Sequence, residues 1–225
     1  MIRKIRKGIR RGRSYLWNNE FSYLIVQRLY SNYYSSIDFD PLETFWLDPN
    51  SITHTVGNIQ SAAPPSYHAE YINRPMDFPD CVGAVCGGDW DNLGSPVSEF
   101  FAHESYHNHF LDDLPWTQTQ FFKVHADRIS EHSYSFGCSS TEELLEKLQS
   151  YDSLFRRLAE EGFKQQTELR EHPFHGVNVC LARDGTPMYY GHGRNRLILA
   201  QVLDLPRIPV NVTLRHRENL APKPE

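Results

Sequence analysis

The pattern of apolar and polar positions is clearest in the last 50 residues of the chain. Apolar side chains alternate with small or polar ones over residues 177–182, which predicts a half-buried β-strand. Asp184-Gly185 is typical of a hairpin turn and leads into a second short strand. The glycine-rich segment 191–196 precedes an apolar stretch, 197–203, that predicts a buried helix. Alternation then returns at 210–214, so the expected order is strand, hairpin, glycine-rich turn, helix, strand.

Helical periodicity dominates the middle of the chain. The spacing predicts a helical stretch from Pro96 to Leu111, and a second helix beginning at Pro115-Trp116. Ser140 and Glu143 form a capping box that opens a long helix, which ends at Gly162. Its apolar positions recur at helical spacing and are predicted to face the core: Leu144, Leu148, Tyr151, Phe155 and Leu158.

The segments before residue 96 are less regular. Residues 43–52 predict a short strand that stops at an Asp-Pro turn. Residues 57–80 are rich in Pro, Ser, Asn and Gly without periodicity, which indicates a long loop. Residues 81–85 fit another strand, which runs into a Gly-Gly-Asp-Trp-Asp segment at 87–91.

These elements predict an α+β protein with one main domain, and the length of 225 residues and a hydrophobic fraction of 40% allow a sizeable core. We expect residues 1–43 to form a basic arm followed by an amphipathic helix. Residues 44–216 then form the domain, with a helical and loop insertion at about 57–118, and residues 217–225 form a tail.

Charge is distributed unevenly along the chain. Seven of the 23 Lys and Arg residues fall within the first 13 residues, where there is no acidic side chain. The other 212 residues carry 16 basic and 28 acidic side chains, a net charge of −12. Because so acidic a body repels a phosphate backbone, we expect a polyanion to bind only at the arm or at a local basic pocket.

The arm itself has a helical stripe of apolar residues, formed by Ile2, Ile5, Ile9 and Leu16. Basic side chains fill much of the remaining circumference. This pattern fits a helix on an anionic membrane surface, or an arm that folds on a partner such as a nucleic acid. A solvated, disordered terminus is the alternative, since Gly8 and Gly12 each lower helix stability by about 1 kcal/mol.

The cellular compartment is predicted from what the sequence lacks. There is no run of about 20 apolar residues to span a membrane, and the N-terminus has too short an apolar run for a signal peptide. Four irregularly spaced cysteines do not suggest a disulfide framework. We therefore expect a reduced, cytoplasmic protein.

The glycine-rich turn is the strongest candidate site. A turn between a strand and a helix directs backbone N–H groups and the helix dipole at one point, where an anion is stabilised. Gly191 and Gly193 permit close backbone approach, and Arg194 and Arg196 offer charge-assisted hydrogen bonds to phosphate or carboxylate. His192 titrates near neutrality and is a candidate proton donor or acceptor. The alternative is a plain surface turn with hydrated arginines.

The residues from about 165 to 216 resemble the ParB/sulfiredoxin-like superfamily. The resemblance rests on the strand and turn at 177–185, on the box Gly193-Arg194-Asn195-Arg196 that opens a helix, and on Ile208-Pro-Val with Arg215-His216 after it. It is more diffuse over 44–164, and the chain looks most similar to ParB-like proteins with a Gly-Gly-Asp-Trp-Asp segment. The resemblance implies a small mixed sheet with flanking helices and an anion site at the box.

Departures from the family pattern narrow what the resemblance implies. Sulfiredoxin has a catalytic cysteine in the box and ParB clamps have a glutamate there, whereas this chain has Arg194. Sulfinic-acid repair and CTP hydrolysis are therefore not expected. Many relatives have His where Asn195 stands. Some members phosphorylate small molecules, so we expect a phosphate- or nucleotide-binding protein, and a phosphotransferase or phosphohydrolase if it is an enzyme. A non-enzymatic nucleic-acid adaptor that uses the arm is the alternative.

Asp89 and Asp91 are the most suggestive acidic residues. If their loop folds over the turn at 191–196, both are candidates to hold Mg²⁺ against a bound phosphate and to assist catalysis. The alternative is a capped turn with Trp90 in the core.

A competing motif lies in the helix predicted from Pro96. His103-Glu104-Ser-Tyr-His107 matches HExxH, in which two histidines on one helix face bind zinc and the glutamate acts as a base. His109 offers a further nitrogen ligand. Spacing identifies no third ligand, so a zinc hydrolase with His103 and His107 as ligands is the second alternative.

Overall fold

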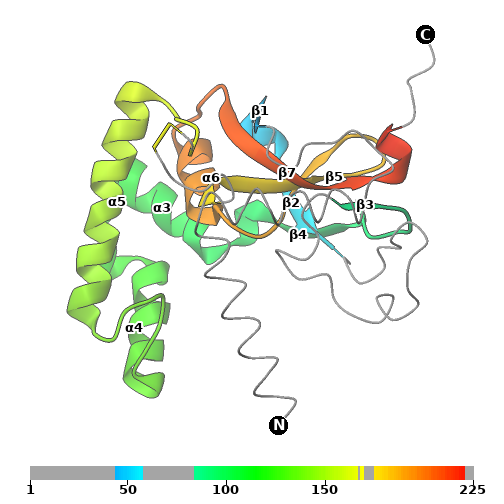
Figure 1. The fold of residues 1–225 in the computed structure, drawn as a ribbon. Helices are drawn as coiled ribbons and strands as arrows, with labels where there is room; N and C mark the ends of the chain where they lie inside the picture. The colour runs from blue at the N-terminus through cyan, green and yellow to red at the C-terminus, as the bar shows by residue number, and fades with distance from the viewer. Residues whose placement is uncertain (1–43, 58–83, 167, 170–174, 221–225) are drawn as a thin grey trace.

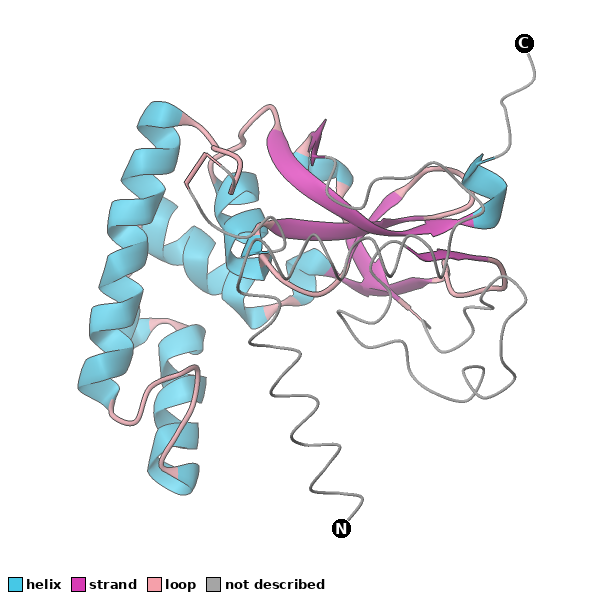
Figure 2. Ribbon diagram, viewed as in Figure 1, coloured by secondary structure: helices cyan, strands magenta, loops and turns pink. Residues whose placement is uncertain are grey.

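The computed structural model describes residues 44–57, 84–166, 168–169 and 175–220. These residues form the predicted mixed α+β fold, in which helices gather beside one twisted sheet (Figures 1 and 2). The predicted arm at 1–43, nearly all of the predicted loop at 57–80 and the last five residues of the predicted tail lie outside the described part. No helix in the described part is long and apolar enough to cross a membrane.

Within the described residues the sheet contains seven strands, in the order β1-β7-β5-β6-β2-β4, and β3 also pairs with β7. The strands are β1 (Thr44–Leu47), β2 (His54–Val56), β3 (Ala84–Cys86), β4 (Leu93–Pro96), β5 (Val177–Leu181), β6 (Pro187–Tyr189) and β7 (Ile208–His216). β3 and β4 lie within the predicted insertion, so part of that segment belongs to the sheet.

β5 and β7 form the centre of the sheet. They pair in parallel, which requires the crossover that runs through β6 and the following helix. β1 is antiparallel to the first half of β7, and β3 is parallel to its last three residues, from Leu214 to His216. β5 and β6 form the predicted hairpin, with Gly185 in the turn at a φ of 90°.

The helices largely follow the predicted boundaries. They are α3 (Phe101–Leu111), α4 (Gln120–His132), α5 (Thr141–Glu161) and α6 (Arg194–Val202), and short 3₁₀ turns precede α3 and α4. The capping box is present: the Ser140 hydroxyl accepts from the Glu143 N–H at 3.2 Å, and the Glu143 carboxylate accepts from the Ser139 N–H at 2.7 Å. α6 begins at Arg194 rather than at the predicted Leu197, so the arginines lie in its first turn.

Two hydrophobic clusters lie on opposite sides of β5. Val177 and Val179 belong to the larger cluster, which includes the helices, whereas Cys180 belongs to a smaller one. The buried members of the smaller cluster are Trp90, Cys180, Ala182, Met188 and Leu214. The prediction of a half-buried strand is therefore wrong for β5, since the smaller cluster covers the face expected to meet solvent.

Candidate functional site

The predicted anion site is the N-terminus of α6. Gly193 is its N-cap residue, in a left-handed conformation with φ of 90°, and Gly191 has a φ of 91°. A Cβ atom on Gly193 would lie 2.3 Å from the Gly176 carbonyl oxygen and 2.6 Å from the Val177 Cα. Both the conformation and the packing therefore require glycine at 193, because the turn lies against the start of β5.

The hydrogen bonds around the turn hold it in place before any ligand binds. The Asn178 N–H donates to the His192 carbonyl at 3.2 Å, and the Tyr190 N–H donates to the Asn178 carbonyl at 3.1 Å. The Tyr189 hydroxyl donates to the Gly191 carbonyl at 2.6 Å. Burial raises the pKa of Tyr189, so this hydroxyl stays protonated at neutral pH and remains a donor.

The first turn of α6 is electropositive. It contains no acidic residue, and its N-cap residue, Gly193, has no side chain to accept from its N–H groups. The Arg194 N–H is paired with the Tyr189 hydroxyl. Arg194 is exposed and its guanidinium lies 5.3 Å from the centroid of the Phe100 ring. Arg196 donates to the His175 carbonyl. The turn thus combines the positive end of a helix dipole with two guanidinium groups held by neighbouring segments.

His192 lies on the exposed side of this turn. Partial burial, with a smaller contribution from the charge of His175, lowers the pKa of His192 below its ordinary value. The imidazole is therefore mostly neutral at pH 7, which is the form that can accept a proton.

The Asn195 side chain, which lies between the two arginines in the sequence, points toward α5. Its amide nitrogen donates to the Tyr151 hydroxyl of α5 at 3.0 Å. The sequence predicts Tyr151 only as a core residue, because helical spacing reveals an apolar position but not the partner of a hydroxyl.

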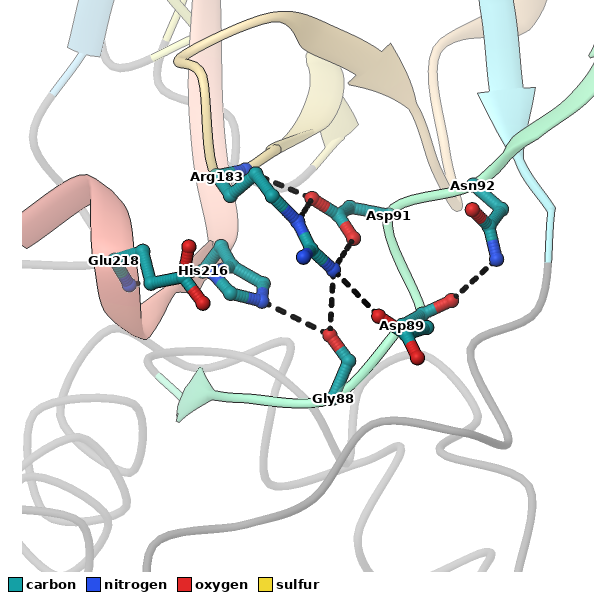
Figure 3. Close-up of polar contacts among 7 residues, drawn as sticks. All are labelled: Gly88, Asp89, Asp91, Asn92, Arg183, His216 and Glu218. Carbon is teal, nitrogen blue, oxygen red and sulfur yellow. Dashed lines mark hydrogen bonds and ion pairs between the residues drawn. The ribbon is translucent and has the colours of Figure 1, made fainter.

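Asp89 and Asp91 lie in a different site, around Arg183 (Figure 3). Asp91 accepts from the Arg183 Nε and Nη2 atoms, both at 2.8 Å, and from the Arg183 backbone N–H at 2.9 Å. The same Nη2 donates to Asp89 at 2.8 Å and to the Gly88 carbonyl at 3.1 Å. Hydrogen bonding by Arg183 lowers the pKa of Asp91 to about 2, against the opposing effect of burial.

The loop that contains these acids is fixed to the smaller hydrophobic cluster. Trp90 is fully buried, and its ring centroid lies 5.8 Å from that of His216. His216 Nε2 lies 2.9 Å from the Gly88 carbonyl, and its Nδ1 accepts from the Glu218 N–H at 3.2 Å, so the imidazole has its proton on Nε2. The burial of Trp90 agrees with the alternative for this segment, a capped turn with Trp90 in the core.

The structure does not bring the two acids to the glycine-rich turn. Gly193 packs at the start of β5, against Gly176 and Val177, whereas Arg183 follows the end of that strand. At a rise of about 3.3 Å per residue, the six residue steps from 177 to 183 separate these points by roughly 20 Å. A metal ion held by Asp89 and Asp91 would therefore not reach a phosphate at Gly193.

A cavity of about 460 Å³ adjoins the Arg183 cluster. Its lining includes Thr53, His54, Asp89, Asp184, Thr186 and Met188. Asp89 remains a candidate for a cation, since its side chain is 78% exposed. Within the described residues, however, no group of three or more His, Cys, Asp or Glu side chains is arranged to hold a metal ion.

The HExxH motif is helical, as expected, and lies in α3. His103 is half-buried, and burial together with the nearby His107 lowers its pKa. His107 is exposed and lies 3.5 Å from the Asp112 carboxylate. His109 has other partners, the Leu114 carbonyl at 2.7 Å and Asp152 at 3.1 Å. No further ligand joins His103 and His107 in the described part of the chain.

Comparisons with models of protein families, with curated proteins and with solved structures returned no significant match to this chain.

Proposed function

We propose that this protein binds a phosphate-bearing small molecule or a nucleotide at the turn formed by residues 191–196. The observation that carries this proposal is the first turn of α6, where Arg194 and Arg196 accompany helix N–H groups with no acidic neighbour in the turn. An anion there gains from the helix dipole and from charge-assisted hydrogen bonds at once.

The arrangement favours phosphate because the turn is preorganised. Hydrogen bonds to β5 and β6 fix the backbone, so the N–H groups lose little freedom when an anion binds. The Arg194 side chain makes no ion pair with the described residues, and its guanidinium lies over the Phe100 ring. Its guanidinium can therefore move to a ligand without breaking a salt bridge.

If the bound molecule reacts, His192 is the group best suited to move a proton. It belongs to the turn, and its lowered pKa makes it a proton acceptor at neutral pH. A phosphotransferase or phosphohydrolase reaction would use it in this role. Mg²⁺ binding at Asp89 is a separate prediction, since Asp89 and Asp91 lie at the other end of β5.

The family assignment is also a proposal. The order β5, β6, α6, β7 agrees with the strand, turn, box and Ile-Pro-Val strand by which the sequence resembles the ParB/sulfiredoxin-like superfamily. The parallel pairing of β5 with β7 supports it, because the box then opens the crossover helix. The cytoplasm remains the proposed compartment, on the sequence grounds already given.

Isothermal titration calorimetry with inorganic phosphate, ATP and CTP tests the proposed site. For each probe that binds the unaltered chain, Arg194→Ala should lower the affinity by about tenfold or more. A hydrogen bond to a charged group contributes roughly 1.5–3 kcal/mol. Arg207→Ala is the matched control, because Arg207 is also exposed but lies beyond the other end of α6. Equal affinity in both variants, or no binding of any of these probes to the unaltered chain, would contradict the proposal.

A further inference from the structure

Three basic side chains from different helices lie around the buried His125 of α4. Arg128 follows about one turn later on α4, Lys147 belongs to α5, and Arg194 begins α6. Burial, and then the charges of these three side chains, lower the pKa of His125 below its ordinary value. Because the imidazole is mostly neutral at pH 7, the positive charge here comes from Arg128, Lys147 and Arg194, which we call the basic cluster.

No carboxylate pairs with the basic cluster in the described part of the chain. The ion pairs there involve other histidines, lysines and arginines. The charges that act on the His125 pKa are likewise all positive. The chain outside its first 13 residues has a net charge of −12, so three basic side chains without an acidic partner are a local exception. Such a local excess of positive charge attracts a polyanion.

Lys147 is held next to the start of α6. Its ammonium lies 4.4 Å from the centroid of the Phe136 ring and donates to the Phe136 carbonyl at 2.6 Å. Tyr151 follows one turn later on the same face of α5, and its hydroxyl accepts from Asn195, the neighbour of Arg194. The Tyr151 contact therefore brings the Lys147 face of α5 to the first turn of α6. An ammonium has three N–H groups, so Lys147 can donate to a ligand and to Phe136 at once.

We propose that Lys147 binds a second phosphoryl group of the ligand whose first phosphate lies at the start of α6, so that the ligand carries linked phosphates. This inference rests on the proposed phosphate site at residues 191–196. Arg194 and Lys147 have long side chains on two helices, and both charges act on the same imidazole, so one extended polyanion can contact both. Each contact is a charge-assisted hydrogen bond. Arg128 is exposed and adds long-range attraction.

Lys147→Gln tests the Lys147 subsite, since it removes the charge and keeps an N–H donor for the Phe136 carbonyl. Calorimetry on the full chain measures the affinities of tripolyphosphate and of inorganic phosphate at matched ionic strength. We expect about tenfold weaker binding of tripolyphosphate, the effect of one lost charge-assisted hydrogen bond, and nearly unchanged binding of inorganic phosphate. Lys147→Arg should retain most of the affinity for tripolyphosphate. Lys123→Gln is the matched control, because Lys123 is an exposed lysine of α4 outside the basic cluster.

The possible results separate the Lys147 subsite from the phosphate site. If Arg194→Ala weakens the binding of both probes and Lys147→Gln weakens neither, the subsite is overturned and the phosphate site stands. Equal losses in Lys147→Gln and Lys123→Gln also overturn the subsite, because net charge alone would explain them. If neither probe binds the unaltered chain, both proposals are overturned.

Nuclear magnetic resonance on the unaltered ¹⁵N-labelled chain decides the case even if Lys147→Gln does not fold. Tripolyphosphate should shift the backbone amide signals of Phe136 and Lys147 as well as those of residues 193–196. Inorganic phosphate should shift only the second group. If tripolyphosphate leaves the signals of Phe136 and Lys147 unchanged while it shifts those of residues 193–196, the Lys147 subsite is overturned.

Discussion

Arg183 and Asp91 form a two-point ion pair that joins segments 92 residues apart in the sequence. Nε and Nη2 of Arg183 each lie 2.8 Å from a different oxygen of the Asp91 carboxylate, and the Arg183 backbone N–H donates to one of them. The Asp91 side chain is only 6% exposed, whereas that of Arg183 is 41% exposed. The pair fastens the 87–92 loop to the β5–β6 hairpin.

Replacing Asp91 by asparagine should therefore destabilise the fold. The variant loses charge-assisted hydrogen bonds and points an amide N–H₂ group at Arg183, so we expect a loss of about 2 kcal/mol in the free energy of unfolding. Urea denaturation measures it. Asp89→Asn is the control, and it should change stability by less than about 0.5 kcal/mol because Asp89 is exposed. Equal effects of the two substitutions would contradict the role given to Asp91.

The lowered pKa of Asp91 also leads to a prediction of how the stability of the fold changes at acid pH. The folded-state pKa of Asp91 is about 2, below the ordinary value of 3.8, so its contribution is fully present above pH 4. That contribution is lost as the pH falls from about 4 to about 2. The Asp91→Asn variant should lose less stability than the unaltered chain over this interval. Parallel melting curves from pH 5 to pH 2 check this, and identical slopes would refute it.

Trp90 should be the main anchor of the 87–92 loop. It is fully buried in the smaller hydrophobic cluster, so Trp90→Ala leaves a large cavity and should cost about 3–5 kcal/mol. Trp46→Ala is the control on β1, where the side chain is 42% exposed, and about 1 kcal/mol is expected. Chemical denaturation compares the two variants. A loss at Trp90 no larger than at Trp46 would show that the loop is not anchored this way.

Gly193 should tolerate no side chain. Gly193→Ala puts a methyl group 2.3 Å from the Gly176 carbonyl oxygen at a φ of 90°, so we expect a loss of more than about 3 kcal/mol or a failure to fold. Gly185→Ala is the matched control. It has the same φ, but its Cβ meets only the movable Asn219 side chain at 3.2 Å, so strain of about 1–2 kcal/mol is expected. If thermal melting shows similar losses for the two substitutions, backbone strain alone would explain them, and the close contact with Gly176 would have no role.

The elements that the sequence predicted correctly are those determined by neighbouring residues. The capping box at Ser140, the hairpin at Gly185 and the glycine-rich start of α6 each depend on a few adjacent side chains. The two faces of β5 could not be predicted the same way. Asn178 and Cys180 suggested exposure, whereas both are buried, and Cys180 is covered by Trp90 and Leu214, which come from distant segments.

The candidate site was found only in part for the same reason. The pattern identified Gly193, Arg194 and Arg196, because a glycine-rich turn before a helix is a local signal. It identified Asp89 and Asp91 but not Arg183, a single arginine after a strand with nothing nearby to mark it. The contact between Asn195 and Tyr151 was also missed, because it joins two helices whose residues are 44 positions apart in the sequence.

Nuclear magnetic resonance tests the central claim, phosphate binding at the start of α6, most directly. Inorganic phosphate is titrated into the ¹⁵N-labelled full chain, with sodium chloride of matched ionic strength as the control. The account predicts that the backbone amide signals of residues 193–196 shift the most and saturate together. Larger shifts at Arg183 or Arg207 than at Arg194, or no saturable shift anywhere, would contradict it.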